Sequence, residues 1–428
     1  MRVKNTEPPV VSGGSIATVG PTSPAKALAV LHGARRVVDR DGADGLTLRA
    51  VAQESGVSTS LAIYYYGSMA RLEALLLDSI WSKEVADHLQ ELKNLPASLA
   101  NRVDILVRFH STIAQNQDGF RTYSELITHV IRNANTREKV AKIYEGYRLD
   151  LNFPLLESSL RSCCETRALA ALMLAIGEGL PLARLIDDSE EVMTECFALL
   201  AELFKNESEE HQVAIVSEQT TTGQATPGCL TSHFRQLRDN PEAHNTTPGR
   251  LLSAGIQLLH RGGLREITFS NISRVSGESK SLITYYFKSK QGFLEALGNR
   301  LLTNWSRGLH EGFFGRRTVT PTYLKDLLFG DESLLLSLLL LLPLLRQSPA
   351  LRVQAKAVYL ETIESISPLF EFPRPELDGY SSTAAATVFV AALHGLAVQS
   401  LYDPERFLLD DPLRLLKKML PFMAVSSD

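Results

Sequence analysis

Cysteine is scarce in this chain, and the few present have no metal-ligand pattern. They are Cys163, Cys164, Cys196 and Cys229, whereas a structural zinc site takes its ligands in closely spaced pairs. Adjacent Cys163 and Cys164 are also poorly placed for a disulfide of low strain. We therefore expect reduced structural thiols, with a redox sensor as the alternative, and we predict neither a metal nor a cofactor.

The sequence also lacks an apolar run of the roughly 20 residues that a membrane-spanning helix needs. Its most apolar stretch, residues 334–345, contains Pro343 and lies between charged residues, which favours a buried core helix. Residues 1–22 are rich in Pro, Gly, Ser and Thr and have no apolar segment typical of a secretory signal. We expect a flexible arm on a cytoplasmic protein that does not bind a membrane.

Motifs of common enzyme classes are missing as well. There is no Gly-rich phosphate loop, no His-Glu-x-x-His pair and no Gly-x-Ser-x-Gly elbow. We predict no catalytic residue and no enzymatic activity.

Charge is nearly balanced overall, with a net charge of −4, but its distribution is uneven. Residues 249–307 hold nine Lys or Arg against three acids, whereas residues 25–80 hold six of each. Clustered positive charge is typical of surfaces that bind nucleic acid. Residues 249–307 are therefore the stronger candidate for such a surface.

The chain contains an internal repeat. Residues 29–76 match residues 250–297 without a gap when the sequence is shifted by 221 positions. Identical pairs include Arg40 and Arg261, Gly42 and Gly263, Thr47 and Thr268, Gly56 and Gly277, Ser58 and Ser279, Tyr64 and Tyr285, Tyr65 and Tyr286, and Ser68 and Ser289. These matches are spread over many residue types, which indicates a duplicated unit rather than a shared composition.

Each copy predicts four short helices. The first helix has apolar residues at helical spacing and ends at Gly42 or Gly263. The second helix begins after Thr47 or Thr268, whose hydroxyl can cap it. Glycine at 56 or 277 then makes a tight turn. Serine at 58 or 279 caps the third helix, and serine at 68 or 289 caps the fourth. Two short helices joined by such a turn are typical of a helix-turn-helix. A generic helical hairpin is the alternative for one copy, and two copies at the same spacing disfavour it.

The segments AVAQESGVSTSLAIYYYGSMARLEALL and NISRVSGESKSLITYYFKSKQGFLEAL resemble the helix-turn-helix of the tetracycline-repressor (TetR) family of transcriptional regulators. Segments that begin at Ala168 and Ala384 are similar to the family's penultimate helix, which usually forms a dimerisation bundle with the last helix. The resemblance implies an all-α fold of two tandem TetR-like repeats. Each repeat would hold an N-terminal three-helix, helix-turn-helix DNA-binding domain and a C-terminal helical regulatory and dimerisation bundle.

The domain boundaries follow from the repeat and its resemblance. The expected divisions are a flexible arm (1–22), a first helix-turn-helix domain (23–82), a first helical regulatory domain (83–206), a linker (207–246), a second helix-turn-helix domain (247–305) and a second helical regulatory domain (306–428).

The third helix of each copy is expected to enter the major groove, because only this groove admits a helix and distinguishes all four base pairs. The predicted reading residues are Thr59, Ser60, Ile63, Tyr64 and Tyr65 in the first copy and Lys280, Ser281, Thr284, Tyr285 and Tyr286 in the second. Phosphate contacts are expected from Thr47, Thr268 and Lys290. Ordinary packing between helices is the alternative for Tyr64 and Tyr285.

The two copies differ where the resemblance places a phosphate contact. Lys290 matches the family's lysine at the start of the fourth helix, but the first copy has Met69 there. The family's histidine is replaced by Tyr65 and Tyr286, whose hydroxyls can still donate to phosphate. We expect the second copy to supply most of the DNA affinity, with an ordinary solvated face as the alternative for its lysines.

The resemblance also implies an effector pocket among the central helices. Polar residues inside otherwise apolar helices are the candidates, namely His110, Tyr123, His129, Tyr144, Tyr359 and His394. For each of them, a satisfied core or surface residue is the favoured alternative.

We predict a sequence-specific, ligand-responsive transcriptional repressor that acts as a single-chain pseudo-dimer. Its partners would be a double-stranded DNA operator and a small-molecule effector, with further self-association left open. The alternative is a ligand-binding or protein-interaction module in which one or both helix-turn-helices are degenerate. The neutral first copy and Met69 favour that alternative.

Overall fold

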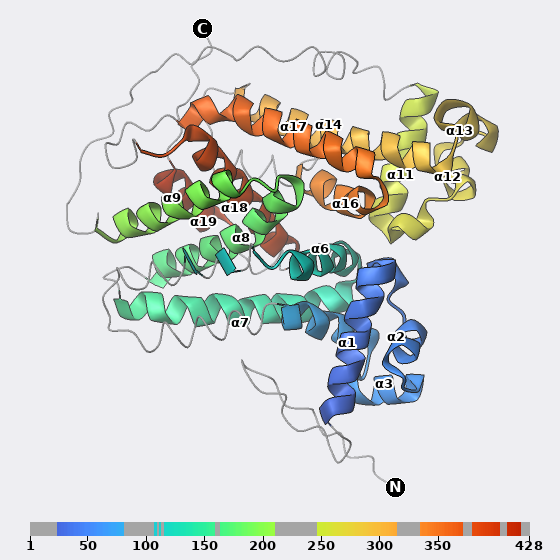
Figure 1. The fold of residues 1–428 in the computed structure, drawn as a ribbon, viewed down its shortest axis with the longest axis horizontal. Coiled ribbons are helices and arrows are strands. Elements are labelled where there is room, and N and C mark those ends of the chain that lie inside the picture. The colour runs from blue at the N-terminus through green and yellow to red at the C-terminus, as the bar shows by residue number, and fades with distance from the viewer. Residues whose placement is uncertain are drawn as a thin grey trace.

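The computed structural model describes residues 24–80, 107–108, 111–112, 115–158, 163–209, 246–314, 334–370, 379–402 and 409–420. Within these ranges all regular structure is helical (Figure 1), so the predicted all-α class is confirmed. The arm expected at 1–22 and most of the linker expected at 207–246 lie outside the described residues.

The helices follow the same order in the two halves of the chain. The first half contains α1 (Pro24–Asp41), η1 (Ala43–Gly45), α2 (Leu48–Ser55), α3 (Thr59–Tyr66), a helix over residues 69–80, α6 (Gln117–Arg132), α7 (Ala134–Ser158), α8 (Cys163–Ile186) and α9 (Glu190–Glu209). The second half contains α11 (Thr247–Gly262), η4 (Leu264–Glu266), α12 (Phe269–Ser276), α13 (Lys280–Phe287), α14 (Lys290–Phe314), α16 (Leu334–Gln347), α17 (Pro349–Ile366), η5 (Ser367–Phe370), α18 (Ser382–Tyr402) and α19 (Asp410–Met419).

Most of the caps predicted from the repeat are present. The hydroxyl of Thr47 accepts a hydrogen bond from the Ala50 amide at 3.2 Å, and that of Thr268 accepts one from the Asn271 amide at 3.1 Å. These caps start α2 and α12 because they satisfy amides that have no partner inside the helix. Ser279 differs from the prediction, since its hydroxyl pairs with Ser281 at 2.8 Å and caps no amide.

The turns before and after α2 and α12 use glycine at positive φ. Gly42 and Gly263 both have φ of 76°, and Gly56 and Gly277 are left-handed at 65° and 74°. Only glycine adopts these angles without strain. The first helix, the second helix and the turn between them are therefore set in the same way in both copies.

We name residues 24–80 the first head and residues 247–301 the second head. In each, the first and fourth helices bury their apolar faces, as the sequence predicts. The buried face of the fourth helix includes residues that are at most 3% exposed, among them Leu72, Leu76 and Ile80 in the first head and Phe293, Leu297 and Leu301 in the second. The heads lie on one side of the molecule, and the remaining helices form a body on the other (Figure 1).

Helices α8 and α18 cross at the centre of the body through a pair of glycines. A Cβ atom on Gly179 would lie 1.9 Å from the carbonyl oxygen of Ala391, and one on Gly395 would lie 2.0 Å from that of Ala175. Each glycine therefore lets its helix approach the backbone of the other. Helix α9 also packs on α18, and α19 packs on α8, so the contacts are reciprocal.

Two helices, Thr166–Ile186 and Ser382–Tyr402, are long and apolar enough to cross a membrane, but 89% and 94% of their most apolar windows are buried inside the fold. They act here as core helices. The apolar stretch 334–345 is likewise part of the core, because residues 339–345 of α16 are buried, and Pro343 also borders a cleft between the heads. Cys196 is buried and unpaired, and the side chains of the other cysteines are outside those described.

Candidate nucleic-acid interface

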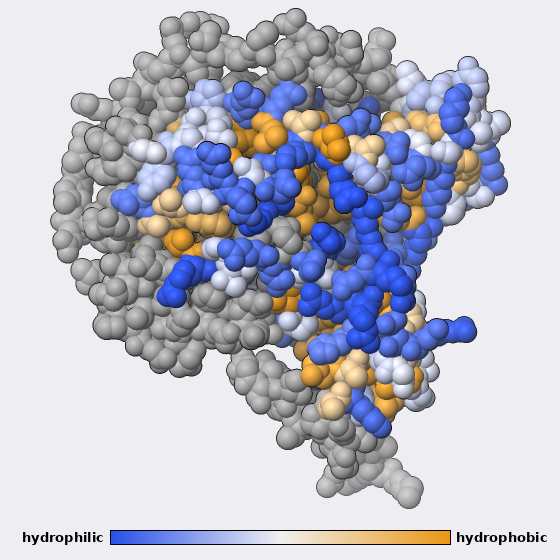
Figure 2. All heavy atoms as spheres, in the orientation of Figure 1, coloured by the Kyte–Doolittle hydropathy of each residue, from blue (hydrophilic) through white to orange (hydrophobic). Residues whose placement is uncertain are grey.

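The third helices, α3 and α13, lie at opposite ends of the side on which the heads project (Figure 1). Helix α1 packs on α2, and α2 on α3; α11, α12 and α13 repeat this arrangement. Hydrophilic residues gather along the notch between the heads on the same side (Figure 2). This side offers two exposed short helices, each preceded by another short helix and a glycine turn.

Helix α13 is fixed by one buried side chain and presents the rest of its predicted reading residues to solvent. Ile283 is fully buried, whereas Lys280, Ser281 and Thr284 are exposed. The rings of Tyr285 and Tyr286 are 66% and 42% exposed and meet edge to face at 5.0 Å. All five reading residues predicted for the second head are therefore accessible, and packing does not account for Tyr285.

Helix α3 presents a less polar surface. Thr59 and Ser60 are exposed, and Ile63 and Tyr64 are 45% and 54% exposed, so packing does not account for Tyr64 either. Tyr65 is a correction, because its ring is only 6% exposed. The expected phosphate contact from Tyr65 does not fit this burial, whereas its counterpart Tyr286 is exposed.

The predicted phosphate contacts lie at helix N-termini. Thr47 and Thr268 are exposed at the starts of α2 and α12. Their hydroxyl oxygens accept hydrogen bonds from backbone amides, which leaves the hydroxyl hydrogens to donate. Lys290 is exposed at the start of α14. Such positions favour anions because the helix dipole and unpaired amides point outward.

Two arginines of the first head pair with the same acid, and in the second head Arg250 pairs with Glu278 at 2.5 Å. The carboxylate of Glu54 forms ion pairs with Arg36 at 2.8 Å and with Arg40 at 2.6 Å. Both arginines lower the pKa of Glu54. In the second head, Lys280, Lys288 and Lys290 make no ion pair with any acid in the described part of the chain. These three lysines therefore face no acid among the described residues, whereas Arg36 and Arg40 of the first head are paired with Glu54.

The backbone at Lys288 is a feature that sequence reasoning missed. Lys288 has a φ of 65°, and it is the one non-glycine residue at positive φ among the described residues. Its ammonium donates to the carbonyl of Tyr285 at 2.7 Å and lies 5.4 Å from the centre of that ring. The internal repeat could have indicated this conformation, because Lys288 aligns with Gly67 of the first head, which has a φ of 74°.

Two of the predicted effector residues meet around a buried acid that the prediction omitted. The hydroxyls of Tyr123 and Tyr144 lie 2.6 Å apart, and both donate to Oε1 of Glu178. Burial raises the pKa of Glu178 to about 8, although the two hydroxyl donors act to lower it. The sequence could have indicated this residue, because Glu178 is an acid among the apolar residues of helix α8.

Two more predicted residues meet in the second half. The ring of Tyr359 stacks on Trp305 at 5.7 Å, and Nε1 of Trp305 donates to Nε2 of His394 at 3.1 Å. Burial lowers the pKa of His394 to about 3, so the imidazole is neutral at ordinary pH. Glu178 and His394 occupy matching positions when the segments from Ala168 and Ala384 are aligned.

The other effector candidates do not join these groups. His129 lies on α6, where its Nε2 is 3.1 Å from Oε1 of Glu73, and His110 is outside the described residues. A cavity between Glu178 and His394 has a volume of only about 10 Å³. This is the space of roughly one water molecule, so the core is closed in this state.

Within the described residues the geometry defines an all-α protein with two heads, whose short helices α3 and α13 are accessible from one side. Residues 251–297 match the family model of bacterial regulatory proteins of the tetR family. The matched residues run from α11 into α14, which identifies the second head as a DNA-binding domain of this type.

A solved structure is similar to part of the chain. It is the crystal structure of the multidrug binding protein EbrR complexed with imidazole, at 22% identity and a TM-score of 0.31 over 42% of this chain and 96% of that one. No curated protein matches the sequence.

Proposed function

We propose that this protein is a sequence-specific transcriptional regulator that binds double-stranded DNA with both heads. The observation that carries the proposal is the exposed surface of α13, with Lys280, Ser281, Thr284 and the two tyrosines at the end of a helix-turn-helix that matches the tetR family. These side chains supply donors, acceptors and apolar contacts to base edges. Thr268 and Lys290 would hold the flanking phosphates.

The first head is proposed as a second module of the same type. Its support is the internal repeat, the shared caps and positive-φ glycines, and the exposed Thr59, Ser60, Ile63 and Tyr64. The tandem division is then two helix-turn-helix domains, 23–82 and 247–305, each followed by a helical regulatory domain. A degenerate first head is the second candidate, and the buried Tyr65 and the paired arginines favour it.

The two halves are proposed to form an internal pseudo-dimer. The reciprocal contacts of Gly179 and Gly395 support it, because a twofold interface repeats each contact with the partners exchanged. Linking both halves in one chain raises their effective concentration to about the millimolar range. The pair is therefore expected to stay assembled at dilutions that would dissociate separate chains.

A small-molecule effector is proposed to act through the polar groups of the core. The hydrogen-bonding groups that line or adjoin the small central cavity are Tyr123, Tyr144 and Glu178 in one half and Trp305, Tyr359 and His394 in the other. Since ligand sites usually enclose about 300–1,000 Å³, binding there requires α6, α8 and α18 to separate. We propose that this separation changes the placement of the heads and releases a repressor from its operator in the cytoplasm.

Selection from random-sequence duplex DNA tests the central proposal. The full chain should enrich a motif with two half-sites, and the enriched duplex should shift in a mobility assay. Failure to enrich any sequence, with no difference between selected and random duplexes, would reject sequence-specific binding and favour an interaction module with degenerate heads.

Salt dependence tests whether Lys290 of the second head contacts a phosphate. Lys290→Ala should weaken binding to all duplexes and flatten the log–log salt slope by about one unit. Lys139→Ala is the matched control, because Lys139 is exposed on α7 and makes no ion pair with a described acid. Equal losses from the two variants would contradict a phosphate contact by Lys290.

A further inference from the structure

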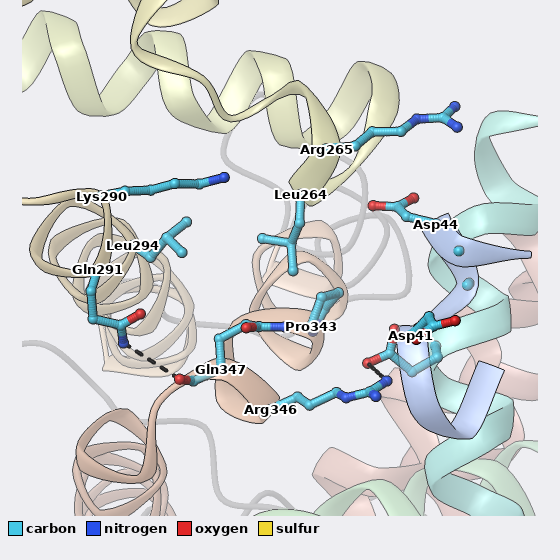
Figure 3. Close-up of a pocket in the computed structure, with 14 residues that line it drawn as sticks. Asp41, Asp44, Leu264, Arg265, Lys290, Gln291, Leu294, Pro343, Arg346 and Gln347 are labelled. Carbon is cyan, nitrogen blue, oxygen red and sulfur yellow. Dashed lines mark hydrogen bonds and ion pairs between the residues drawn. The ribbon is translucent and has the colours of Figure 1, made fainter. Parts of the chain in front are cut away.

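A cleft of about 660 Å³ separates the two heads. One wall carries Asp41 and Asp44 of the first head, and the other carries Arg265 and Lys290 of the second half (Figure 3). The floor is the C-terminal end of α16, where Arg346 reaches across toward the first head (Figure 3). Besides contacts such as that of Glu73 with His129, which hold the first head on its own half, this cleft offers a contact with the second half at its floor.

Arg346 binds the C-terminal end of α1. Its guanidinium donates to the carbonyl oxygens of Val38 at 3.1 Å and Asp39 at 2.8 Å, and also to that of Arg40. The last carbonyls of a helix have no partner inside the helix and form the negative end of its dipole. The Val38 carbonyl also accepts from the Gly42 amide at 2.9 Å, so the cation adds a second bond there, supplies a donor to the carbonyls of Asp39 and Arg40, and offsets the dipole at the same point.

The contact joins the two halves of the chain. Arg346 lies in the last turn of α16, which packs on α14 and α17 of the second half and on α6 of the first. Beside it lies Glu125 of α6, 3.7 Å from the guanidinium. Burial raises the pKa of Glu125, while the charge of Arg346 acts to lower it, so the arginine also keeps this acid ionised more readily.

The first half has its own contact with the same helix end. The hydroxyl of Thr122, on α6, donates to Asp39 of α1. Thr122 comes from the half to which the first head belongs, and it reaches the second half only indirectly, through the packing of α6 on α16. Arg346 is different because its helix is packed against α14, the helix that begins in the second head.

We propose that Arg346 is a positioning residue that fixes the first head relative to the second and so sets the spacing between the two half-sites that the protein accepts. This inference rests on the proposed DNA-binding function. The chemistry is a fork of charge-assisted hydrogen bonds, which holds direction as well as distance. A single-point cation such as lysine cannot reproduce it fully.

The test compares spacing profiles. Operators that carry the selected half-sites are prepared with spacers from about two base pairs shorter to about two base pairs longer than the optimum, which lies near one helical turn, and the affinity of each is measured. Arg346→Gln should lower affinity at the optimal spacing by about tenfold, the equivalent of one lost charge-assisted contact. It should lose much less at the other spacings, so the profile flattens.

Two further variants separate positioning from loss of charge or fold. Arg346→Lys should fall between the wild type and Arg346→Gln, since it keeps the charge but not the fork. Arg352→Gln removes the same charge from an exposed position on α17 and should keep the wild-type profile. A uniform loss of affinity with an unchanged profile in Arg346→Gln and Arg346→Lys would overturn the inference.

A measurement without DNA keeps the inference separate from the proposed function. Spin labels are placed at Lys26→Cys on α1 and Arg274→Cys on α12, both exposed, in a chain whose four native cysteines are replaced by alanine. The distance distribution should be narrow with Arg346 and with Arg352→Gln, and broad with Arg346→Gln. Failure of the chain to select DNA rejects the proposed function, whereas unchanged distance distributions reject the role of Arg346.

Discussion

Lys288 shows how a single residue can trade backbone strain for a charge at the proposed DNA-facing surface. Its φ and ψ of 65° and −42° are nearly those of Gly67, at 74° and −40°, in the other head. A side chain in such a region costs on the order of 1 kcal/mol. The hydrogen bond to Tyr285 and the position of the ammonium near its ring compensate in part.

Lys288→Gly should therefore leave the stability unchanged or raise the free energy of unfolding by up to about 1 kcal/mol. Relief of strain favours the folded state, and the greater freedom of glycine in the unfolded chain opposes it. Affinity for DNA should fall, because a cation that could neutralise a phosphate is lost. Urea unfolding and a mobility assay measure the two effects, and a variant clearly less stable than the wild type would show that the contacts of Lys288 with Tyr285 outweigh its backbone strain.

Glu178 is a second residue whose environment makes a measurable prediction. Its folded pKa of about 8 is above the ordinary value of 4.5, so the folded protein binds a proton that the unfolded chain has released between these two pH values. Stability from this group is fully present below about pH 4.5 and is lost as the pH rises toward 8.

Glu178→Gln should remove this pH dependence, since the amide oxygen can still accept the two tyrosine hydroxyls. The variant should be more stable than the wild type at pH 8 by up to a few kcal/mol, because a pKa difference of one between the folded and unfolded states is worth about 1.4 kcal/mol. The advantage should shrink as the pH falls toward about 5. Thermal unfolding of both proteins across this range measures it, and a constant difference at all pH values would contradict a raised pKa.

At the scale of helices, the crossing of α8 and α18 depends on the absence of two side chains. The backbones approach so closely at Gly179 and Gly395 that an added methyl group would overlap a carbonyl oxygen. Overpacking of this kind usually costs about 1–3 kcal/mol, because neighbouring backbone must shift. The cost should fall on the contact between the halves.

Gly179→Ala should lower the free energy of unfolding by about 1–3 kcal/mol. The control is Gly146→Ala, in α7, where an added Cβ meets nothing within 4 Å. That change should be neutral or raise stability by up to about 1 kcal/mol, since alanine is the better helix former. Denaturant unfolding of the pair decides the matter, and a Gly179→Ala protein as stable as Gly146→Ala would show that the helices can separate without cost.

The helices of each head could be predicted from sequence because their signals are local. Thr47 and Thr268 cap the next helix from within three residues, and Gly42 and Gly263 end the previous one. Burial of Tyr65 but not of Tyr286 could not be predicted, because their local sequences are alike. The difference depends on the surrounding helices.

The long-range groups were also beyond a reading of the sequence. Glu178 and Tyr123 are 55 positions apart, and Arg346 is 308 positions from Val38. Nothing near Arg346 in the sequence indicates that its partners are carbonyl oxygens at the end of another helix. Helical periodicity predicts which side chains are buried, but it does not predict which helices meet.

For the whole molecule, the consequence of having both heads in one chain is that they can differ. A homodimer presents two identical third helices, whereas here α13 has Lys280 and an exposed Tyr286 where α3 has Thr59 and a buried Tyr65. The fourth helices differ too, with Lys290 against Met69. Differences at base-reading positions favour different bases, so two unlike half-sites fit this protein better than a palindrome.

We therefore predict that selection recovers an asymmetric pair of half-sites, about one helical turn or slightly more apart, bound by a single chain. Light scattering of the complex measures the stoichiometry. Thr59→Lys should make the preferred first half-site resemble the second, because it introduces the reading residue of α13 at the matching position of α3, while Lys139→Thr on the body should leave both half-sites unchanged. A strictly palindromic optimum occupied by two chains would contradict the prediction, since it would mean that equivalent heads from separate molecules pair on DNA.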